Sequence, residues 1–380
     1  MLLDVIVMPG LLVLSGETSN PRRRSGARRT NSFSTEESRL NRPGRGHTIQ
    51  TPAEVELRRL PSVIAVHTVL AVAVLHAVAG AQGAAARPFV TQVEYNRWRQ
   101  ELSNWGRWGK DDQAGALNLI TPAKRREAAG LVKDGTTVSL AVDVNESKSA
   151  DNPNPYERVV TAVGPPYAMD RLAVNYHGGA HTHLDALSHR IFDGHMYNGF
   201  DAGEVTREDG AKKDSIYTAH AGIVTRGVLI DIPALKGVPY LEPGTRIFVD
   251  DLEAWEKKAG VKVSSGDAIF IRAGRWVARD TSSAKASGLD ASVIPWLKQR
   301  DVAVLASEYA VDARPSSDGL GLAVHDFALA YLGIHVIDNC DLTALAEAAG
   351  ARKRWIFQFV AAPLPIRTGT GSPINPIAVF

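Results

Sequence analysis

Cysteine is almost absent from this chain, and its absence narrows the chemistry. Cys340 is the single cysteine among 380 residues. One thiol cannot form an intramolecular disulfide, a cysteine-built zinc site or an iron–sulfur cluster. A metal in this protein would therefore be held by histidines and carboxylates, which are ligands suited to zinc, manganese or a similar divalent ion.

An excess of one charge and several catalytic signatures are also missing. The formal net charge is only +2, so bulk charge does not indicate a nucleic-acid partner. The sequence has no G-x-S-x-G nucleophile elbow and no G-x-x-x-x-G-K-[ST] phosphate loop. Gly319-Leu320-Gly321 lacks the third glycine of a dinucleotide-binding loop. A serine hydrolase or a nucleotide-binding enzyme thus has no support in the sequence.

The N-terminal region does not resemble a folded domain. Residues 1–55 are rich in Arg, Ser, Asn, Thr and Pro and lack apolar periodicity, which predicts a disordered or mis-assigned extension. Residues 56–86 place Arg58-Arg59 before an apolar run and then small residues, the layout of a secretory signal peptide. An uncleaved anchor is the alternative, because the run approaches the ~20 residues that span a bilayer. We expect an exported protein, periplasmic or secreted, whose true start lies downstream of Met1; a mature chain retaining residues 22–29 would contradict this.

Residues 87–380 have a uniform composition without linkers or repeats, which predicts one domain. Short β-branched or apolar runs predict strands over 137–142, 227–232, 246–249, 268–272, 302–306, 334–337 and 355–362. Capping residues and helical spacing predict helices over 121–132, from Asp250 or Asp251 to 258, over 322–332, and from Asp341 to 350. Because helices and strands intermix without regular βαβ units, we expect an α+β fold with a mixed β-sheet core and flanking helices.

A concentration of histidines singles out one segment. Five of the eleven histidines lie between His177 and His195. In an extended strand alternate residues share a face, so His181, His183 and Asp185 would point the same way. Two imidazoles and a carboxylate form a common zinc set that leaves a position open for water. An ordinary polar edge strand is the alternative, but two histidines and an aspartate at alternate positions favour a metal site.

The same segment resembles a known family. Residues 182–189 are similar to the second half of the signature H-x-G-T-H-x-D-x-P-x-H. This signature belongs to the cyclase family of metal-dependent hydrolases, which includes bacterial kynurenine formamidases, isatin hydrolases and certain dienelactone hydrolases. Three positions depart from it: Gly179 stands at the first His, His181 at the Gly, and Leu187 at the Pro. The resemblance implies a cyclase-like fold and a metal centre.

Two histidines compete for the first ligand position. We interpret the exchange of Gly179 and His181 as the loss of one ligand and the gain of another on the same strand face, which favours His181. His177 is the second candidate, because a register anchored on it reads H-x-G-x-H through His181. That register misplaces Asp185 and His189, so we rank it second.

The resemblance continues towards the C-terminus. Family members complete the metal centre with a histidine and an acidic residue, and the matching positions here are His325 and Asp338. Asp338 stands where the family has Glu, which shortens the reach by one methylene. Residues 369–373 resemble the closing G-x-G-S-P of the family, and residues 104–109 and 115–118 resemble the opening of one of its branches.

These residues together predict a hydrolase. A divalent ion, zinc or manganese, lowers the pKa of bound water and polarises a carbonyl, and His189 would act as general base and then as acid. The expected substrate is a small molecule with an amide, cyclic amide or lactone bond. The sequence leaves open one ion or two, and Asp185 would bridge a pair. A non-catalytic periplasmic binding protein and a metal-dependent lyase or cyclase are the alternatives. The resemblance further implies a homodimer or homotetramer.

Overall fold

The computed structural model describes residues 87–278, 282–316 and 319–380. The predicted extension, residues 1–55, and the predicted signal or anchor segment, residues 56–86, lie outside the described residues. Within the described ranges, no helix combines the length and the apolar character needed to cross a bilayer.

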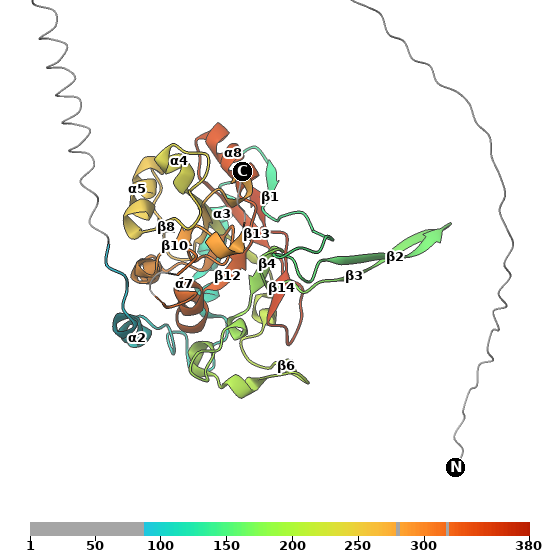
Figure 1. Cartoon of the computed structure of the whole chain (residues 1–380), viewed down its shortest axis with the longest axis horizontal. Helices are drawn as coiled ribbons and strands as arrows, with labels where there is room; N and C mark the ends of the chain where they lie inside the picture. The colour runs from blue at the N-terminus through green and yellow to red at the C-terminus, as the bar shows by residue number, and fades with distance from the viewer. Residues whose placement is uncertain (1–86, 279–281, 317–318) are drawn as a thin grey trace, which may run out of the picture. The chain divides into compact units, whose positions relative to one another are not determined.

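A nine-stranded sheet organises the described part of the chain (Figure 1). The four strands β7, β9, β11 and β12 pair in parallel, whereas the other pairings are antiparallel. This mixed sheet confirms the predicted α+β class. In spatial order the strands are β1 (Thr137–Ser139), β15 (Ile377–Val379), β13 (Ile356–Ala361), β7 (Ile223–Asp231), β9 (Ala268–Arg272), β11 (Val304–Ser307), β12 (His335–Asp338), β4 (His183–Asp185) and β14 (Gly371–Pro373).

Helices flank this sheet. The predicted helix over 121–132 is α3, and the Thr121 hydroxyl caps it by accepting a hydrogen bond from the Lys124 N–H at 3.1 Å. The predicted helix over 322–332 is α7 followed by a π-helical turn, η9, and it ends at Gly333, whose φ is 64°. The helices are α2 (Gln92–Glu101), α3 (Pro122–Ala129), α4 (Ile232–Lys236), α5 (Val249–Ala259), α6 (Ile294–Arg300), α7 (Ala323–Phe327), η9 (Ala328–Leu332) and α8 (Thr343–Arg352).

Two predicted boundaries at the start of α5 were wrong. The strand expected over 246–249 is only β8 (Arg246–Ile247), because Val249 begins α5. Asp251 does not cap α5 but lies at its third position, where its carboxylate accepts the Phe248 N–H at 3.0 Å. In a capping box a carboxylate at this position accepts the backbone N–H of the N-cap residue, whereas a capping side chain accepts from the first turn of the helix. The acidic residues thus located the start of the helix but not its cap.

The central strands are buried on both faces. Along β9, Ile269 and Ile271 belong to one apolar cluster, and Ala268 and Phe270 belong to another. Because successive side chains of a strand point to opposite faces, these clusters occupy the two sides of the sheet. The tryptophans of α5 and α6 join the first cluster, and Leu345 of α8 joins the second. This double cover explains why the strands read as continuous apolar runs in the sequence.

Three pairs of strands lie outside the main sheet. The largest is an antiparallel hairpin of β2 (Glu157–Gly164) and β3 (Tyr167–Ala173), which projects from the body of the protein (Figure 1). The sequence pattern did not predict this hairpin. The smaller pairs are β8 with β10 (Gly288–Leu289), and β5 (Val205–Thr206) with β6 (Gly210–Ala211).

Candidate metal centre

The pairing of β4 with β12 positions three of the predicted ligands. The antiparallel register places Asp338 directly opposite His183, and Asp185 lies two residues along on the same face. The His183 Nε2 atom lies 3.4 Å from Asp185 Oδ1 and 3.9 Å from Asp338 Oδ2. All three side chains are buried. The predicted strand-borne set therefore comes together as a compact group.

His325 joins this group from helix α7. Its Nε2 atom lies 3.1 Å from Asp185 Oδ2 and 3.9 Å from Asp338 Oδ2. The carboxylate of Asp312 accepts the backbone N–H groups of Val324 and His325 at 2.8 and 2.9 Å, which holds the first turn of the helix. Sequence reasoning missed Asp312, because it lies well before the helix and outside any local capping pattern.

His177 and His189 reach the group from outside the strands. Their rings stack with centroids 4.1 Å apart and an angle of 6° between the planes. The His177 Nδ1 atom lies 3.0 Å from Asp185 Oδ1, and the His189 Nε2 atom lies 3.9 Å from Asp185 Oδ2. His189 ends the short 3-10 turn η2 (Leu187–His189), and its side chain is 27% exposed. Because it is partly exposed, His189 can meet a substrate.

The structure does not bring His181 into the group, which corrects the predicted placement. Strand β4 begins only at His183, so the alternation of side chains does not extend back to His181. The His181 ring instead lies edge-on to Tyr156, with centroids 6.1 Å apart. Its contribution is its backbone carbonyl, which accepts a hydrogen bond from His183 Nδ1 at 2.8 Å. His177, which we ranked second, occupies the place expected for His181.

Arg275 and Asn339 hold the loop between His177 and His183. The Asn339 side-chain amide donates to the carbonyls of Gly178 and His181, at 2.7 and 3.0 Å. Arg275 donates to Asn339 Oδ1 at 3.0 Å and to the Gly179 carbonyl at 3.0 Å. We refer to Arg275 and Asn339 as the loop clamp. Sequence reasoning missed both residues, although Asn339 follows the predicted ligand Asp338 directly.

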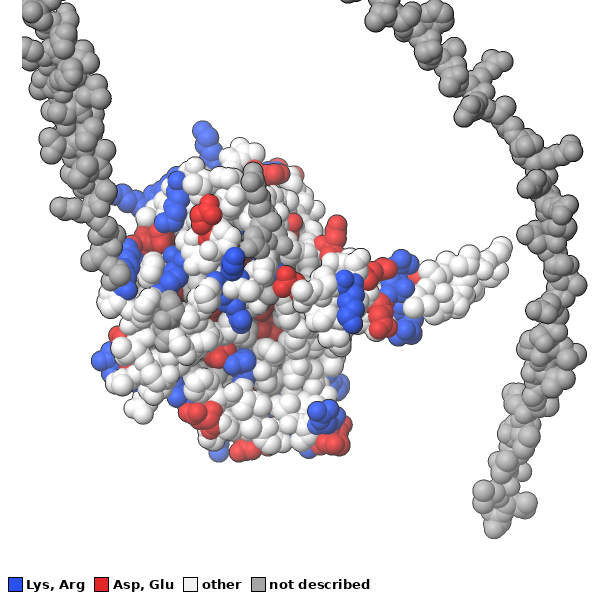
Figure 2. All heavy atoms as spheres, viewed as in Figure 1, with Lys and Arg blue, Asp and Glu red and all other residues white. Residues whose placement is uncertain are grey.

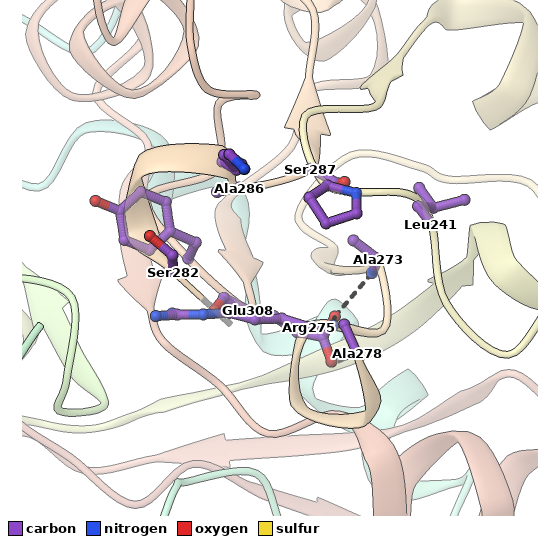
Figure 3. A pocket seen from close by; sticks show the side chains of 11 residues that line it. Leu241, Ala273, Arg275, Ala278, Ser282, Ala286, Ser287 and Glu308 are labelled. Atoms are coloured by element: carbon purple, nitrogen blue, oxygen red, sulfur yellow. Dashed lines mark hydrogen bonds between the residues drawn. The ribbon is translucent and has the colours of Figure 1, made fainter. Parts of the chain in front are cut away.

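A buried glutamate fixes the turn that carries Arg275. Glu308 Oε2 accepts the backbone N–H groups of Ala273, Gly274 and Arg275, at 2.8, 2.6 and 3.0 Å. Figure 3 shows the bond from Ala273 to Glu308 and the Arg275 side chain in the same cavity. Arg275 also donates to the Glu308 carbonyl at 2.8 Å. The loop clamp is therefore anchored to strand β11 through Glu308.

Comparison with known proteins identifies the family. The model of the Cyclase family matches residues 96–313, which is more than half of the chain. The chain belongs to the Cyclase family. A crystal structure described as a novel cyclase is 31% identical, with a TM-score of 0.67, and the match covers 73% of this chain and 99% of that one. These findings confirm the predicted family and fold.

More distant structural likenesses were also found. Isatin hydrolase A from Labrenzia aggregata is 17% identical, with a TM-score of 0.49, and the match covers 66% of this chain and 94% of that chain. Isatin hydrolase A from Ralstonia solanacearum is 18% identical, with a TM-score of 0.47, and the match covers 67% and 94% of the two chains. No curated protein gives a significant match.

The residues of this site fit a divalent cation. Two sets of three ligand atoms each lie within 4.8 Å of one another: His183, Asp185 and Asp338 form one set, and His177, Asp185 and His189 form the other. Asp185 belongs to both sets. The buried Oδ1 atom of Asp338 has no hydrogen-bond partner within the described structure. Nitrogen and carboxylate donors of this kind suit zinc or manganese.

The contacts of the second ring nitrogen of His183 and His325 also support a metal site. His183 uses Nδ1 to donate to a backbone carbonyl, and His325 places Nδ1 3.3 Å from Asp326 Oδ1. Each ring therefore keeps its Nε2 atom towards Asp185. Metal-binding histidines commonly bond their second nitrogen to a carbonyl or a carboxylate, which fixes the tautomer and the ring orientation.

The electrostatics of the group favour a positive charge beside Asp185. Burial opposes ionisation of Asp185, but attraction to His183 outweighs it and holds the pKa of Asp185 well below its usual range. Burial would lower the pKa of His325, yet hydrogen bonds to Asp185 and Asp326 raise that pKa to about 10. Burial raises the pKa of Asp338 to about 6. Asp185 is thus the most strongly anionic point of the group.

Proposed function

We propose that this protein is a metal-dependent hydrolase that cleaves an amide, cyclic amide or lactone bond in a small molecule. The observation that carries the proposal is the convergence on Asp185. Three histidines, His177, His183 and His325, each place a ring nitrogen within 3.4 Å of a carboxylate oxygen of Asp185. Buried histidines and carboxylates gathered in this way are the ligand set of hydrolytic metal sites.

The chain offers ligands for one ion or two. His183, Asp185, Asp338 and His325 would hold an ion on the buried side, and His177 would serve an ion on the exposed side, beside His189. Asp185, which has ligand atoms in both sets, would bridge a pair. When bound, a divalent ion such as zinc or manganese lowers the pKa of a coordinated water and polarises a carbonyl.

His189 is the residue we assign to proton transfer. Its ring is partly exposed, whereas His183 and His325 are buried. Partial burial of the ring, together with repulsion from the neighbouring histidines, lowers the pKa of His189 to about 4, so the imidazole is neutral and able to accept a proton at neutral pH. In this role it takes a proton from the attacking water and returns it to the leaving nitrogen or oxygen. Stacking against His177 holds the ring in place for both steps.

Heavy-oxygen water tests the proposal. The metal-loaded protein is offered a panel of formamides, cyclic amides and lactones in H₂¹⁸O, and the products are analysed by mass spectrometry. A hydrolase incorporates one solvent oxygen into the product, and a His189→Ala variant turns over more slowly by about 10²–10⁴-fold. A product free of solvent oxygen would indicate a lyase or cyclase. Metal binding without turnover of any panel member would instead indicate a binding protein.

We also propose that the protein is exported. The support is the order of basic, apolar and small residues within 56–86, which is the layout of a signal peptide. N-terminal sequencing of the mature protein tests this proposal, and we expect the mature chain to begin close to residue 87.

A further inference from the structure

His181 has a buried side chain that the metal centre does not use. The residue is only 6% exposed. The Asn154 backbone approaches the ring, but neither ring nitrogen has a hydrogen-bond partner of ordinary geometry within the described structure. Only the backbone carbonyl of His181 serves the metal centre, where it accepts from His183 Nδ1 at 2.8 Å and from the Asn339 amide at 3.0 Å. Because buried polar groups are almost always paired, we expect the ring to bind a partner from outside the chain.

The His181 side chain lines a pocket beside the base of the β2–β3 hairpin. The pocket has a volume of about 570 Å³, within the roughly 300–1,000 Å³ of small-molecule sites. Tyr156, whose ring lies edge-on to His181, lines the same pocket. His181 also borders a hollow of about 220 Å³ next to His177, but that hollow falls below the small-molecule range. The larger pocket is therefore the candidate site for a ligand that contacts the His181 ring.

Most of the side chains that line this pocket are apolar. They include Val142, Val144, Leu172, Val174, Leu364 and Ile374. Val144, Leu172 and Leu364 are 59%, 57% and 52% exposed, so the pocket presents apolar surface to solvent. An exposed apolar surface around a concave site is a common mark of ligand binding. The lining thus favours a ligand with an apolar body.

The charges around the pocket disfavour an anion. Among the described residues that line it, Asp143 is the one charged side chain, and none is a lysine or an arginine. Figure 2 shows charge of both signs at the base of the hairpin, where Arg158 pairs with Glu146 at 2.9 Å and Arg171 pairs with Glu157 at 3.4 Å. An anionic ligand would meet a carboxylate without a free cation in the lining.

The polar groups of the lining leave His181 as the anchor. The Thr182 hydroxyl donates to the Asn339 carbonyl at 2.7 Å and accepts the Val142 N–H at 3.0 Å. The Ser139 hydroxyl bonds to the Asn375 side chain at 2.7 Å. Because both hydroxyls are already paired, a polar group of the ligand would bond to the His181 ring.

We propose that this pocket binds an uncharged small molecule with an aromatic ring and one hydrogen-bonding group, held by His181 at a site separate from the metal centre. No residue of the two metal-ligand sets lines the pocket. The aromatic ring would pack against Tyr156, since aromatic pairs favour edge-to-face and offset contacts. The site lies outside the proposed hydrolysis, and its occupation does not require a bound metal.

A matched pair of probes tests the role of His181. 2-Naphthol and 2-methylnaphthalene are similar in shape, but only the first has a hydroxyl group. Fluorescence titration of the full chain measures the affinity for each. We expect His181→Phe, which keeps a ring but lacks the nitrogens, to weaken 2-naphthol binding about 2–10-fold more than 2-methylnaphthalene binding, the effect of one neutral hydrogen bond. A wild type that binds neither probe, or an equal effect on both, would overturn the proposal.

A set of variants tests the location of the bound probe. Leu364→Asp should weaken the binding of both probes by about tenfold or more, because it places a charge beside the apolar ligand. Val93→Asp is the matched control, because Val93 is 80% exposed but lies on α2 and does not line the pocket. His177→Ala should lose metal but still bind 2-naphthol. Thermal unfolding checks that each variant remains folded.

The opposite pattern would contradict the site. Loss of 2-naphthol binding in His177→Ala, with retention in Leu364→Asp, would place the probe at the metal centre. Displacement of 2-naphthol by an excess of the anion 2-naphthoate would contradict the uncharged ligand class, because Asp143 lines the pocket. These measurements report binding without turnover, so they stand or fall independently of the proposed hydrolase activity.

Discussion

The candidate metal centre of this protein has two halves, which are held in place by different kinds of contact. His183, Asp185 and Asp338 lie on adjacent antiparallel strands, and the register of the sheet sets their positions. His177 and His189 lie outside the strands. The loop beside His177 is held by hydrogen bonds from side chains distant in the sequence, chiefly those of the loop clamp. His183 and Asp185 thus follow from an alternating sequence pattern, whereas the loop-borne histidines depend on tertiary contacts.

The largest predicted difference in metal affinity is between alanine variants of the two histidines that compete for the first ligand position. We expect His177→Ala to weaken metal binding by more than the roughly 10–100-fold typical of outer contacts, because its Nδ1 lies 3.0 Å from Asp185. His181→Ala should retain the metal, since only the His181 backbone carbonyl contacts the ligand set. Competition with a chromogenic chelator measures both affinities. Loss of metal in the His181 variant with retention in the His177 variant would reverse our assignment.

A smaller effect is expected from the loop clamp. Asn339 has a φ of 56°, so Asn339→Gly removes its side-chain hydrogen bonds without backbone strain. We expect this variant to lose roughly 10–100-fold in metal affinity, as outer-contact variants do. Asn339→Ala should lose the same bonds and add strain, so it serves as the comparison. If Asn339→Gly bound metal as tightly as the wild type, the loop would not need the clamp.

The smallest predicted effect is on folding stability, and it concerns Asp214, which contacts the turn that carries His189. Asp214 accepts the Ser188 N–H at its carbonyl, and its buried carboxylate has no hydrogen-bond partner within the described structure. Burial raises the pKa of Asp214 to about 8. The folded pKa exceeds the unfolded value of about 3.9. The contribution of the Asp214 carboxyl to folding stability is therefore fully present below about pH 4 and is lost as the pH rises to about 8.

Substitution at Asp214 should remove that pH dependence. We expect Asp214→Asn to be more stable than the wild type by about 1–3 kcal/mol at pH 8, with the difference shrinking towards pH 5. Thermal unfolding across this pH range measures it, and the exposed Asp111→Asn is the control. An equal difference at both pH values would show that the Asp214 carboxyl does not titrate as argued.

The sequence predicted the sheet-borne part of this protein well. Apolar runs located strands such as β9 and β13, and the pattern of His183 and Asp185 located the core of the site. The β2–β3 hairpin escaped prediction because neither of its faces is buried, so it lacks the alternation that marks a half-buried strand. Asp312 and Arg275 escaped because their roles exist only once distant segments pack together.

The choice between His177 and His181 shows the same limit. It depended on where strand β4 begins, and element boundaries are set by pairing partners as much as by local pattern. The family resemblance added His325 and Asp338, which no local pattern would single out. In the structure, Asp338 Oδ2 lies 3.9 Å from His183 Nε2, and His325 Nε2 lies 3.1 Å from Asp185 Oδ2.

Elemental analysis of the purified full chain, prepared without a metal-binding tag, tests the central claim most directly. We predict one or two equivalents of zinc or manganese in the wild type, and their loss in a folded Asp185→Ala variant, which lacks the carboxylate shared by both ligand sets. A folded wild type that contains neither metal and takes up neither when it is added would contradict the account.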